Sequence, residues 1–99
     1  MAEQKVVDLL LSAQKALLGA VIPSLRASAV EWSGENIIVH FYHDGKLSDD
    51  IEDHYMCIGT EIVADFESAM IDEKIIRLDH PKLLPKHDHW IYHRSESSL

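Results

Sequence analysis

Seven histidines are the residues of this chain best suited to chemistry, and His87, His89 and His93 lie close together in the sequence. On a strand, alternate positions share a face, so two imidazoles there could approach one metal ion. Zinc sites normally take three or four protein ligands at defined spacing, and the chain has neither a CxxC nor an HExxH pattern. The spacing favours surface histidines, so we predict no metal site and no cofactor. Metal binding by these histidines is the open alternative.

The pattern for catalysis is equally weak. Histidines adjoin aspartates at His43-Asp44 and Asp53-His54, which resembles an oriented general base. Sequence neighbours on a strand point to opposite faces, however, so adjacency does not create the His–Asp hydrogen bond. There is no Gly-rich phosphate loop and no nucleophile elbow, and acidic residues near Cys57 disfavour a reactive thiolate. We predict that the protein is not an enzyme.

The distribution of charge carries more information. Between Leu47 and Glu73 there are nine acidic residues and neither Lys nor Arg, so this stretch accounts for the whole net charge of −8. A solvated helix face explains part of it, but exposed helices commonly mix both signs. A field of one sign speeds encounter with a basic partner. We predict a protein-binding surface made of acidic residues from this stretch: Asp49, Asp50, Glu52, Asp53, Glu61, Asp65 and Glu67.

Composition excludes several other classes of function. A net charge of −8 opposes binding to nucleic acid, which depends on Lys and Arg. No apolar run approaches the ~20 residues of a membrane span. The single cysteine and the absence of a signal peptide predict a cytoplasmic protein. At 99 residues the chain has room for one core.

These residues must be positioned by six predicted elements. Helical spacing of apolar residues predicts helices over 2–20 and 49–66, the second capped by Ser48. Strand patterns cover 25–32, 36–43, 73–79 and 89–94. The fold class is α+β, with the order α-β-β-α-β-β. We expect a two-layer domain over 1–94, in which two helices cover one face of a four-stranded, mainly antiparallel sheet, followed by a flexible tail over 95–99.

The second strand predicts what lies on each face of that sheet. Alternation places Ile37, Val39 and Phe41 on one side and Ile38, His40 and Tyr42 on the other. If the first set faces the helices, the second lies on an uncovered face rich in aromatic residues, a feature that often marks an interface. We predict a second interface, for a homodimer or another partner, formed by Trp32, His40, Tyr42, Trp90 and Tyr92. A non-enzymatic homo-oligomer of structural or regulatory role is therefore the alternative function.

Five stretches resemble a family of short bacterial proteins. They are SAQKALLGAVIPSLRA (12–27), VEW (30–32), IIVHFYHDG (37–45), TEIVADF (60–66) and EKIIRLDHP (73–81). Some members are similar to immunity proteins that accompany toxins of contact-dependent growth inhibition and related polymorphic toxin systems. The resemblance implies toxin neutralisation, with a basic toxin domain as the partner, and it transfers no catalytic residue.

Overall fold

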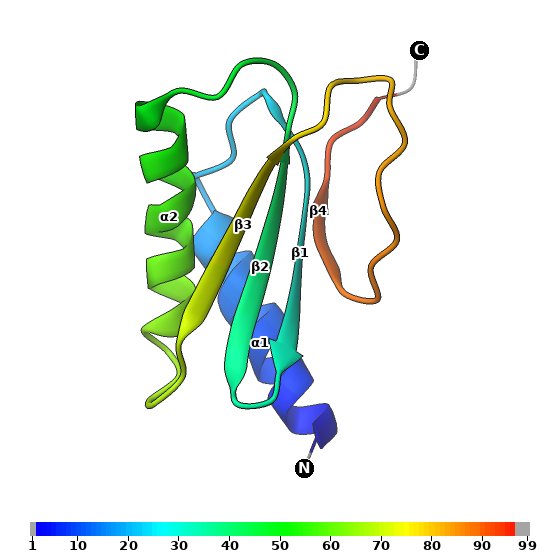
Figure 1. The fold of residues 1–99 in the computed structure, drawn as a ribbon. Helices are drawn as coiled ribbons and strands as arrows, with labels where there is room; N and C mark the ends of the chain where they lie inside the picture. Colours follow the sequence, from blue (N-terminus) through cyan, green and yellow to red (C-terminus); the bar gives the residue numbers. More distant parts are fainter. Residues whose placement is uncertain (1, 97–99) are drawn as a thin grey trace.

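The computed structural model describes residues 2–96, except for the side chain of Ala2. Its six elements follow the predicted order (Figure 1). They are α1 (Ala2–Leu17), β1 (Leu25–Ser33), β2 (Asn36–His43), α2 (Asp49–Val63), β3 (Ile71–Arg77) and β4 (Trp90–His93). None of the helices within residues 2–96 combines the length and apolar composition needed to cross a membrane.

Helix α1 is amphipathic and ends earlier than predicted. Its buried side is formed by Leu9, Ala13 and Leu17, which recur at intervals of four residues. The helix stops at Leu17 because Gly19 adopts a left-handed conformation with φ +75°, which a glycine reaches without steric cost. The next residues form a turn rather than the predicted final turn of helix.

Helix α2 begins as its sequence predicts. The Ser48 side chain accepts a hydrogen bond from the backbone N–H of Ile51 at 3.2 Å and so caps the helix. Its buried side is formed by Tyr55, Ile58 and Ile62, and it packs on the sheet beside α1. The helix ends at Val63, and the turns that follow lead into β3.

The four strands form one mixed sheet in the order β3-β2-β1-β4. Strand β1 pairs antiparallel with β2 and with β4, but β2 and β3 are parallel. The prediction of a mainly antiparallel sheet therefore missed this pairing. Its cause is α2, which runs back along the sheet between the two strands, so that β3 starts at the same end as β2.

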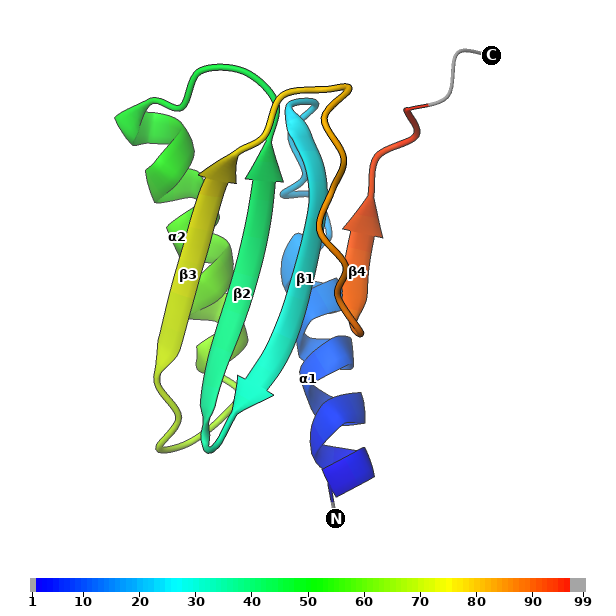
Figure 2. The same cartoon turned by 45° about the vertical axis from the view of Figure 1, so that its right-hand side comes forward.

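The two faces of the sheet differ in what covers them. Both helices lie on one face (Figures 1 and 2), where Ile37, Val39 and Phe41 join the core and are fully buried. This confirms the predicted alternation along β2. On the opposite face, the connection between β3 and β4, orange in Figure 2, crosses in front of the sheet. His40 and Tyr42 are buried on that face, so the expectation of an uncovered surface is wrong for these two residues, whereas Ile76 of the neighbouring β3 is exposed.

The C-terminal segment is tied to β1. Glu96 accepts hydrogen bonds from the buried Arg26 guanidinium at 2.7 and 2.9 Å, and Arg94 pairs with Glu96 and with Asp44. The guanidinium of Arg26 holds the pKa of Glu96 down at about 2. The tail predicted over 95–99 thus includes one anchored residue, and residues 97–99 lie outside the described part of the chain.

Candidate functional site

The structure divides the predicted acidic surface into two groups. Four residues lie in the first turns of α2: Asp49, Asp50, Glu52 and Asp53. The other three lie at its last turn and beyond it: Glu61, Asp65 and Glu67. No Lys or Arg within residues 2–96 forms a salt bridge with any of the seven. Their negative charge is therefore not neutralised by ion pairs along this side of the molecule.

The centre of the exposed face of α2 is neutral. Met56 is 48% exposed, and Cys57 and Thr60 are also exposed. The two acidic groups flank these residues at either end of the helix. This arrangement resembles a protein interface, in which an apolar centre is surrounded by a polar rim.

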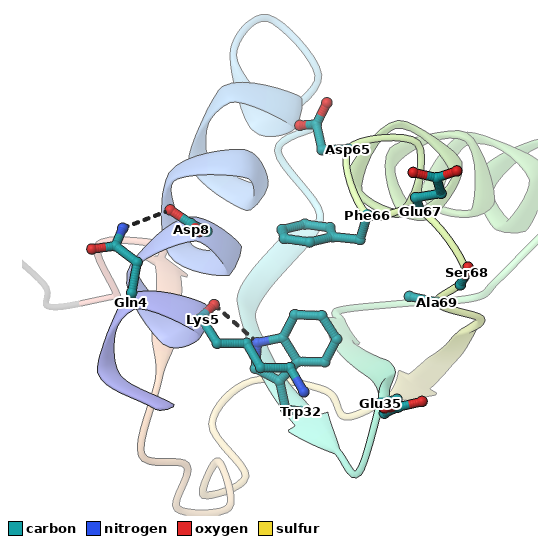
Figure 3. Close-up of a pocket in the computed structure, with 10 residues that line it drawn as sticks. All are labelled: Gln4, Lys5, Asp8, Trp32, Glu35, Asp65, Phe66, Glu67, Ser68 and Ala69. Atoms are coloured by element: carbon teal, nitrogen blue, oxygen red, sulfur yellow. Dashed lines mark hydrogen bonds between the residues drawn. The ribbon is translucent and has the colours of Figure 1, made fainter. Parts of the chain in front are cut away.

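Asp65 and Glu67 of the second acidic group border a groove between α1 and the end of α2 (Figure 3). The groove has a volume of about 540 Å³, within the range of small binding sites. Its lining combines the start of α1, the hairpin between β1 and β2, and the turn after α2: Gln4, Lys5, Asp8, Trp32, Glu35, Asp65, Phe66, Glu67, Ser68 and Ala69.

Two aromatic rings form the floor of this groove. The rings of Trp32 and Phe66 meet edge to face, with centroids 5.3 Å apart. The indole N–H of Trp32 donates to the carbonyl oxygen of Lys5 at 3.0 Å, which fixes the ring against α1. The Lys5 ammonium lies 4.1 Å from the centroid of the Trp32 ring and donates to the Gly34 carbonyl, so it is held within the groove.

Acidic side chains outnumber the basic one around this floor. Asp8, Glu35, Asp65 and Glu67 line the groove, and Lys5 is the basic residue among the lining side chains. Asp65 is oriented by a hydrogen bond from the buried Ser12 hydroxyl at 2.6 Å, and Asp8 accepts one from Gln4 at 2.8 Å. A negative groove with an aromatic floor suits a basic side chain, which can pair with carboxylates and stack on a ring.

Two of these acids were not predicted as site residues. Asp8 and Glu35 are isolated in the sequence, so no local charge pattern marks them. Packing brings them together with Asp65 and Glu67. Asp8 lies one helical turn before the buried Ser12, which places it at the edge of the buried side of α1.

The residues predicted for a second interface do not form one surface. His40 and Tyr42 share the face opposite the helices with Trp90, whose ring centroid lies 6.2 Å from that of Tyr42. Trp32 and Tyr92, by contrast, pack against the core cluster on the helix side. Trp32 pairs with Ile37, and Tyr92 pairs with Ser28, so strand register turns both toward the helices.

His87 completes the cluster on the face opposite the helices. It comes from the connection between β3 and β4, and its Nε2 atom lies 2.6 Å from the Tyr42 hydroxyl. The His40 Nε2 atom lies 2.8 Å from a carboxylate oxygen of Glu31. Burial lowers the pKa of His87, with a smaller contribution from the nearby His40. Burial also raises the pKa of Tyr42.

Sequence reasoning missed Glu31 as a neighbour of His40, although the hairpin contains the signal. The two-residue turn of Gly34 and Glu35 sets Trp32 opposite Ile37 and Ala29 opposite His40. Glu31 and His40 are then diagonal neighbours on one face of the sheet. His87 carries no comparable signal, because only the course of the long connection brings it to this cluster.

Together the fold and the groove define a small α+β domain with an acidic, aromatic-floored recess on its helical side. Residues 6–96 match the family model of the MafI2 immunity protein. The match covers nearly the whole chain, and the protein belongs to this family. This confirms the predicted resemblance to immunity proteins of polymorphic toxin systems. Among curated proteins, none matches the chain.

Proposed function

We propose that this protein neutralises a toxin by binding it with the helical side of the domain, and that the acidic groove receives a basic side chain of the toxin. The observation that carries this proposal is the position of Asp8, Glu35, Asp65 and Glu67 around one aromatic floor, with no ion pair to Lys or Arg among the described residues. The family supports a toxin as the partner.

The chemistry of the groove favours an arginine from the partner. A guanidinium can bind a carboxylate through two parallel hydrogen bonds and stack on an aromatic ring at the same time. Because the Lys5 ammonium already lies over Trp32, the incoming cation meets the Phe66 side of the floor, next to Asp65. The exposed centre of α2 around Met56 then supplies apolar contact area beside this anchor.

The role proposed here is masking rather than catalysis. A bound domain that covers a basic surface keeps that surface from its own target, and the unpaired negative charge speeds the encounter. Such a protein needs neither a cofactor nor a reactive residue, and we propose that it acts in the cytoplasm as a non-enzymatic binding protein. Contact-dependent growth inhibition is the setting that the family resemblance suggests.

Charge reversal at the groove tests this proposal. Glu35 and Glu67 are both exposed, so Glu35→Lys combined with Glu67→Lys should leave the fold intact. The probe is the purified C-terminal domain of the protein encoded in the reading frame immediately upstream of this gene, where we expect the cognate toxin. We expect the double variant to slow association by about tenfold or more at low salt and to lose protection in a growth assay with that toxin.

Two further variants locate the contact. Asp49→Lys with Asp53→Lys reverses two charges in the first acidic group, and Asp72→Lys reverses an exposed charge on β3, away from the groove. Asp72→Lys should bind as the natural protein does. If the natural protein and the three variants all associated with the toxin at the same rate, these acidic side chains would not contribute to association. If association slowed only in the variant with Asp49→Lys and Asp53→Lys, the toxin would contact the first acidic group and not the groove.

The alternative function, a homo-oligomer that uses the aromatic sheet face, gains no support from the packing. Two of its proposed contact residues, His40 and Tyr42, are buried under the chain's own connection. Two others, Trp32 and Tyr92, lie toward the helices. Self-association through another surface stays a prediction, which sedimentation at high concentration would test.

A further inference from the structure

Three side chains on the sheet face opposite the helices converge on one point. Glu31 comes from β1, His40 from β2, and His87 from the connection between β3 and β4. One potential ligand atom from each lies within 4.8 Å of the other two. The rings of His40 and His87 have centroids 4.3 Å apart, and a Glu31 carboxylate oxygen lies 2.8 Å from His40 Nε2.

We propose that Glu31, His40 and His87 form a binding site for a divalent transition metal ion, with Zn²⁺ as the ion that this donor set fits best. Two imidazoles and one carboxylate are a common set of three protein ligands for zinc, with a water molecule in the fourth position. The other divalent ions that imidazole suits, Co²⁺, Ni²⁺ and Cu²⁺, would compete for it.

The distances suit an ion with small local movement. Zinc–nitrogen and zinc–oxygen bonds are about 2.0–2.2 Å long, so ligand atoms around a tetrahedral ion lie about 3.4 Å apart. The separation of 2.8 Å between Glu31 and His40 is shorter than that value, and the other two separations are at most 4.8 Å, so a small movement brings the three atoms to the spacing that an ion requires. The Glu31 side chain is 47% exposed and can move, whereas the His40 side chain is 10% exposed and is held by the sheet.

The surroundings supply the outer contacts that metal ligands need. Ligating histidines usually use their second ring nitrogen for a hydrogen bond that fixes the orientation of the ring. The Tyr42 hydroxyl, at 2.6 Å from His87 Nε2, would be such a partner with His87 binding the ion through Nδ1, and Tyr42 is only 3% exposed. A hollow of about 220 Å³ lined by Glu31 and His87, among others, provides access from solvent.

A bound ion would fasten the connection between β3 and β4 to the sheet. His87 is the ligand that this connection contributes, and the other two ligands belong to the hairpin of β1 and β2. Metal binding would therefore stabilise the folded state, by an amount that rises with the logarithm of the free ion concentration once that concentration exceeds the dissociation constant. This inference concerns the face opposite the groove and does not depend on the identity of the toxin.

The test uses the full chain without an affinity tag, treated with a chelator and then titrated with Co²⁺ as a spectroscopic probe, followed by competition with Zn²⁺. We expect one ion per chain, visible absorption of tetrahedral Co²⁺, and a rise in thermal midpoint with added Zn²⁺. Glu31→Gln and His87→Gln should each weaken binding by about tenfold or more.

His93→Gln is the matched control, because His93 is exposed on β4 and lies outside the cluster. It removes one imidazole and should leave the affinity unchanged. Thermal unfolding in chelator establishes that each variant is folded before its affinity is compared. The proposal would be overturned if the natural protein bound no ion, or if Glu31→Gln and His87→Gln bound the ion as strongly as the natural protein does.

Discussion

The Nδ1 atom of His43 lies 2.6 Å from the hydroxyl oxygen of Tyr55, and both side chains are almost fully buried. The contact joins β2 to α2. Burial lowers the pKa of His43, and a hydrogen bond with the Lys46 backbone, together with nearby Asp44 and Asp79, offsets this only in part. Burial also raises the pKa of Tyr55, so its hydroxyl stays protonated and shares a hydrogen bond with the neutral imidazole. The pair is therefore a buried neutral hydrogen bond that one added proton would disrupt.

This arrangement predicts that the protein loses stability in mild acid. The unfolded chain takes up a proton on His43 near pH 6.5, whereas the folded chain resists protonation because its pKa is lower. The free energy of unfolding should fall as the pH drops below about 6.5. Urea unfolding between pH 5 and 8 measures this slope. His43→Gln should reduce this slope, and His87, whose pKa burial also lowers, should account for part of what remains. His93→Gln should leave the slope as it is, and identical slopes for both variants would assign the effect to other groups.

Removal of the Tyr55 hydroxyl should lower the stability of the protein by more than the loss of one exposed hydrogen bond would. Tyr55→Phe preserves the ring stacked on Phe41 but leaves Nδ1 of His43 buried without its partner. We expect the free energy of unfolding to fall by about 1–3 kcal/mol at neutral pH, measured by urea unfolding. Tyr92→Phe, on a half-buried tyrosine of β4, serves as the comparison. If Tyr55→Phe and Tyr92→Phe changed the free energy of unfolding by the same small amount, the hydrogen bond between His43 and Tyr55 would not contribute specially to stability.

The hydrogen bond from Ser12 to Asp65 should stabilise the groove. The Ser12 hydroxyl is buried and donates to Asp65 Oδ2 at 2.6 Å, which links α1 to the turn after α2. Ser12→Ala should lower the free energy of unfolding by about 1–2 kcal/mol, because a bond to a charged acceptor is lost. Ser33→Ala, at an exposed position, should change it little. Chemical denaturation of the two variants gives the comparison.

Acid should also break the ion pair that anchors Glu96. Because the folded-state pKa of Glu96 is about 2, below its ordinary value of 4.5, the pair stabilises the protein above about pH 4.5 and is lost as the pH falls toward 2. At pH 7 we expect Glu96→Gln to lower the free energy of unfolding by about 2 kcal/mol, since the buried Arg26 loses its carboxylate partner. The difference from the natural protein should vanish near pH 2. Glu35→Gln in the exposed turn is the control, and a difference independent of pH would contradict the assignment.

Gly59 of α2 is packed closely against the Glu73 side chain of β3. A Cβ atom at this position would lie 2.7 Å from the Cγ and Oε2 atoms of Glu73 on β3. Gly59→Ala should therefore lower stability by about 1–3 kcal/mol, although alanine is the better helix former. In a Glu73→Ala background the same change should raise stability by up to about 1 kcal/mol. A double-mutant cycle by urea unfolding measures this reversal of sign, and additive effects would refute the contact.

The sequence predicts the elements of this fold better than their pairing. The β run from Asn36 to His43 and the cap at Ser48 depend on local patterns, and the structure has both at the predicted residues. The parallel pairing of β2 with β3 depends instead on how a helix lies across the sheet. No alternation of apolar residues distinguishes a short half-buried parallel strand from an antiparallel one.

The candidate site was predictable only where its residues are neighbours in the sequence. The acidic residues of α2 and of its following turn form a visible run, so Asp65 and Glu67 were predicted. Asp8 and Glu35 join them through tertiary packing, and Glu31 and His40 meet His87 in the same way. A run of like charges can be seen in the sequence. Contacts between distant segments depend on the course of the connecting loops, which no local sequence pattern reveals.

The pairing of β4 with β1 has a consequence for how the molecule folds. Ala27 lies opposite His93, so this pairing joins two residues separated by most of the chain. Closing so long a loop costs more entropy than forming the hairpin of β1 and β2, and contacts of this kind slow the search for the native state. We expect the hairpin and its helices to assemble first and β4 to dock last. The strand that docks last should also open first, so release of β4 should require less free energy than opening of the other strands. In a hydrogen-exchange experiment the backbone amide of Arg94 should then exchange early, and the amides of β2 should exchange more slowly.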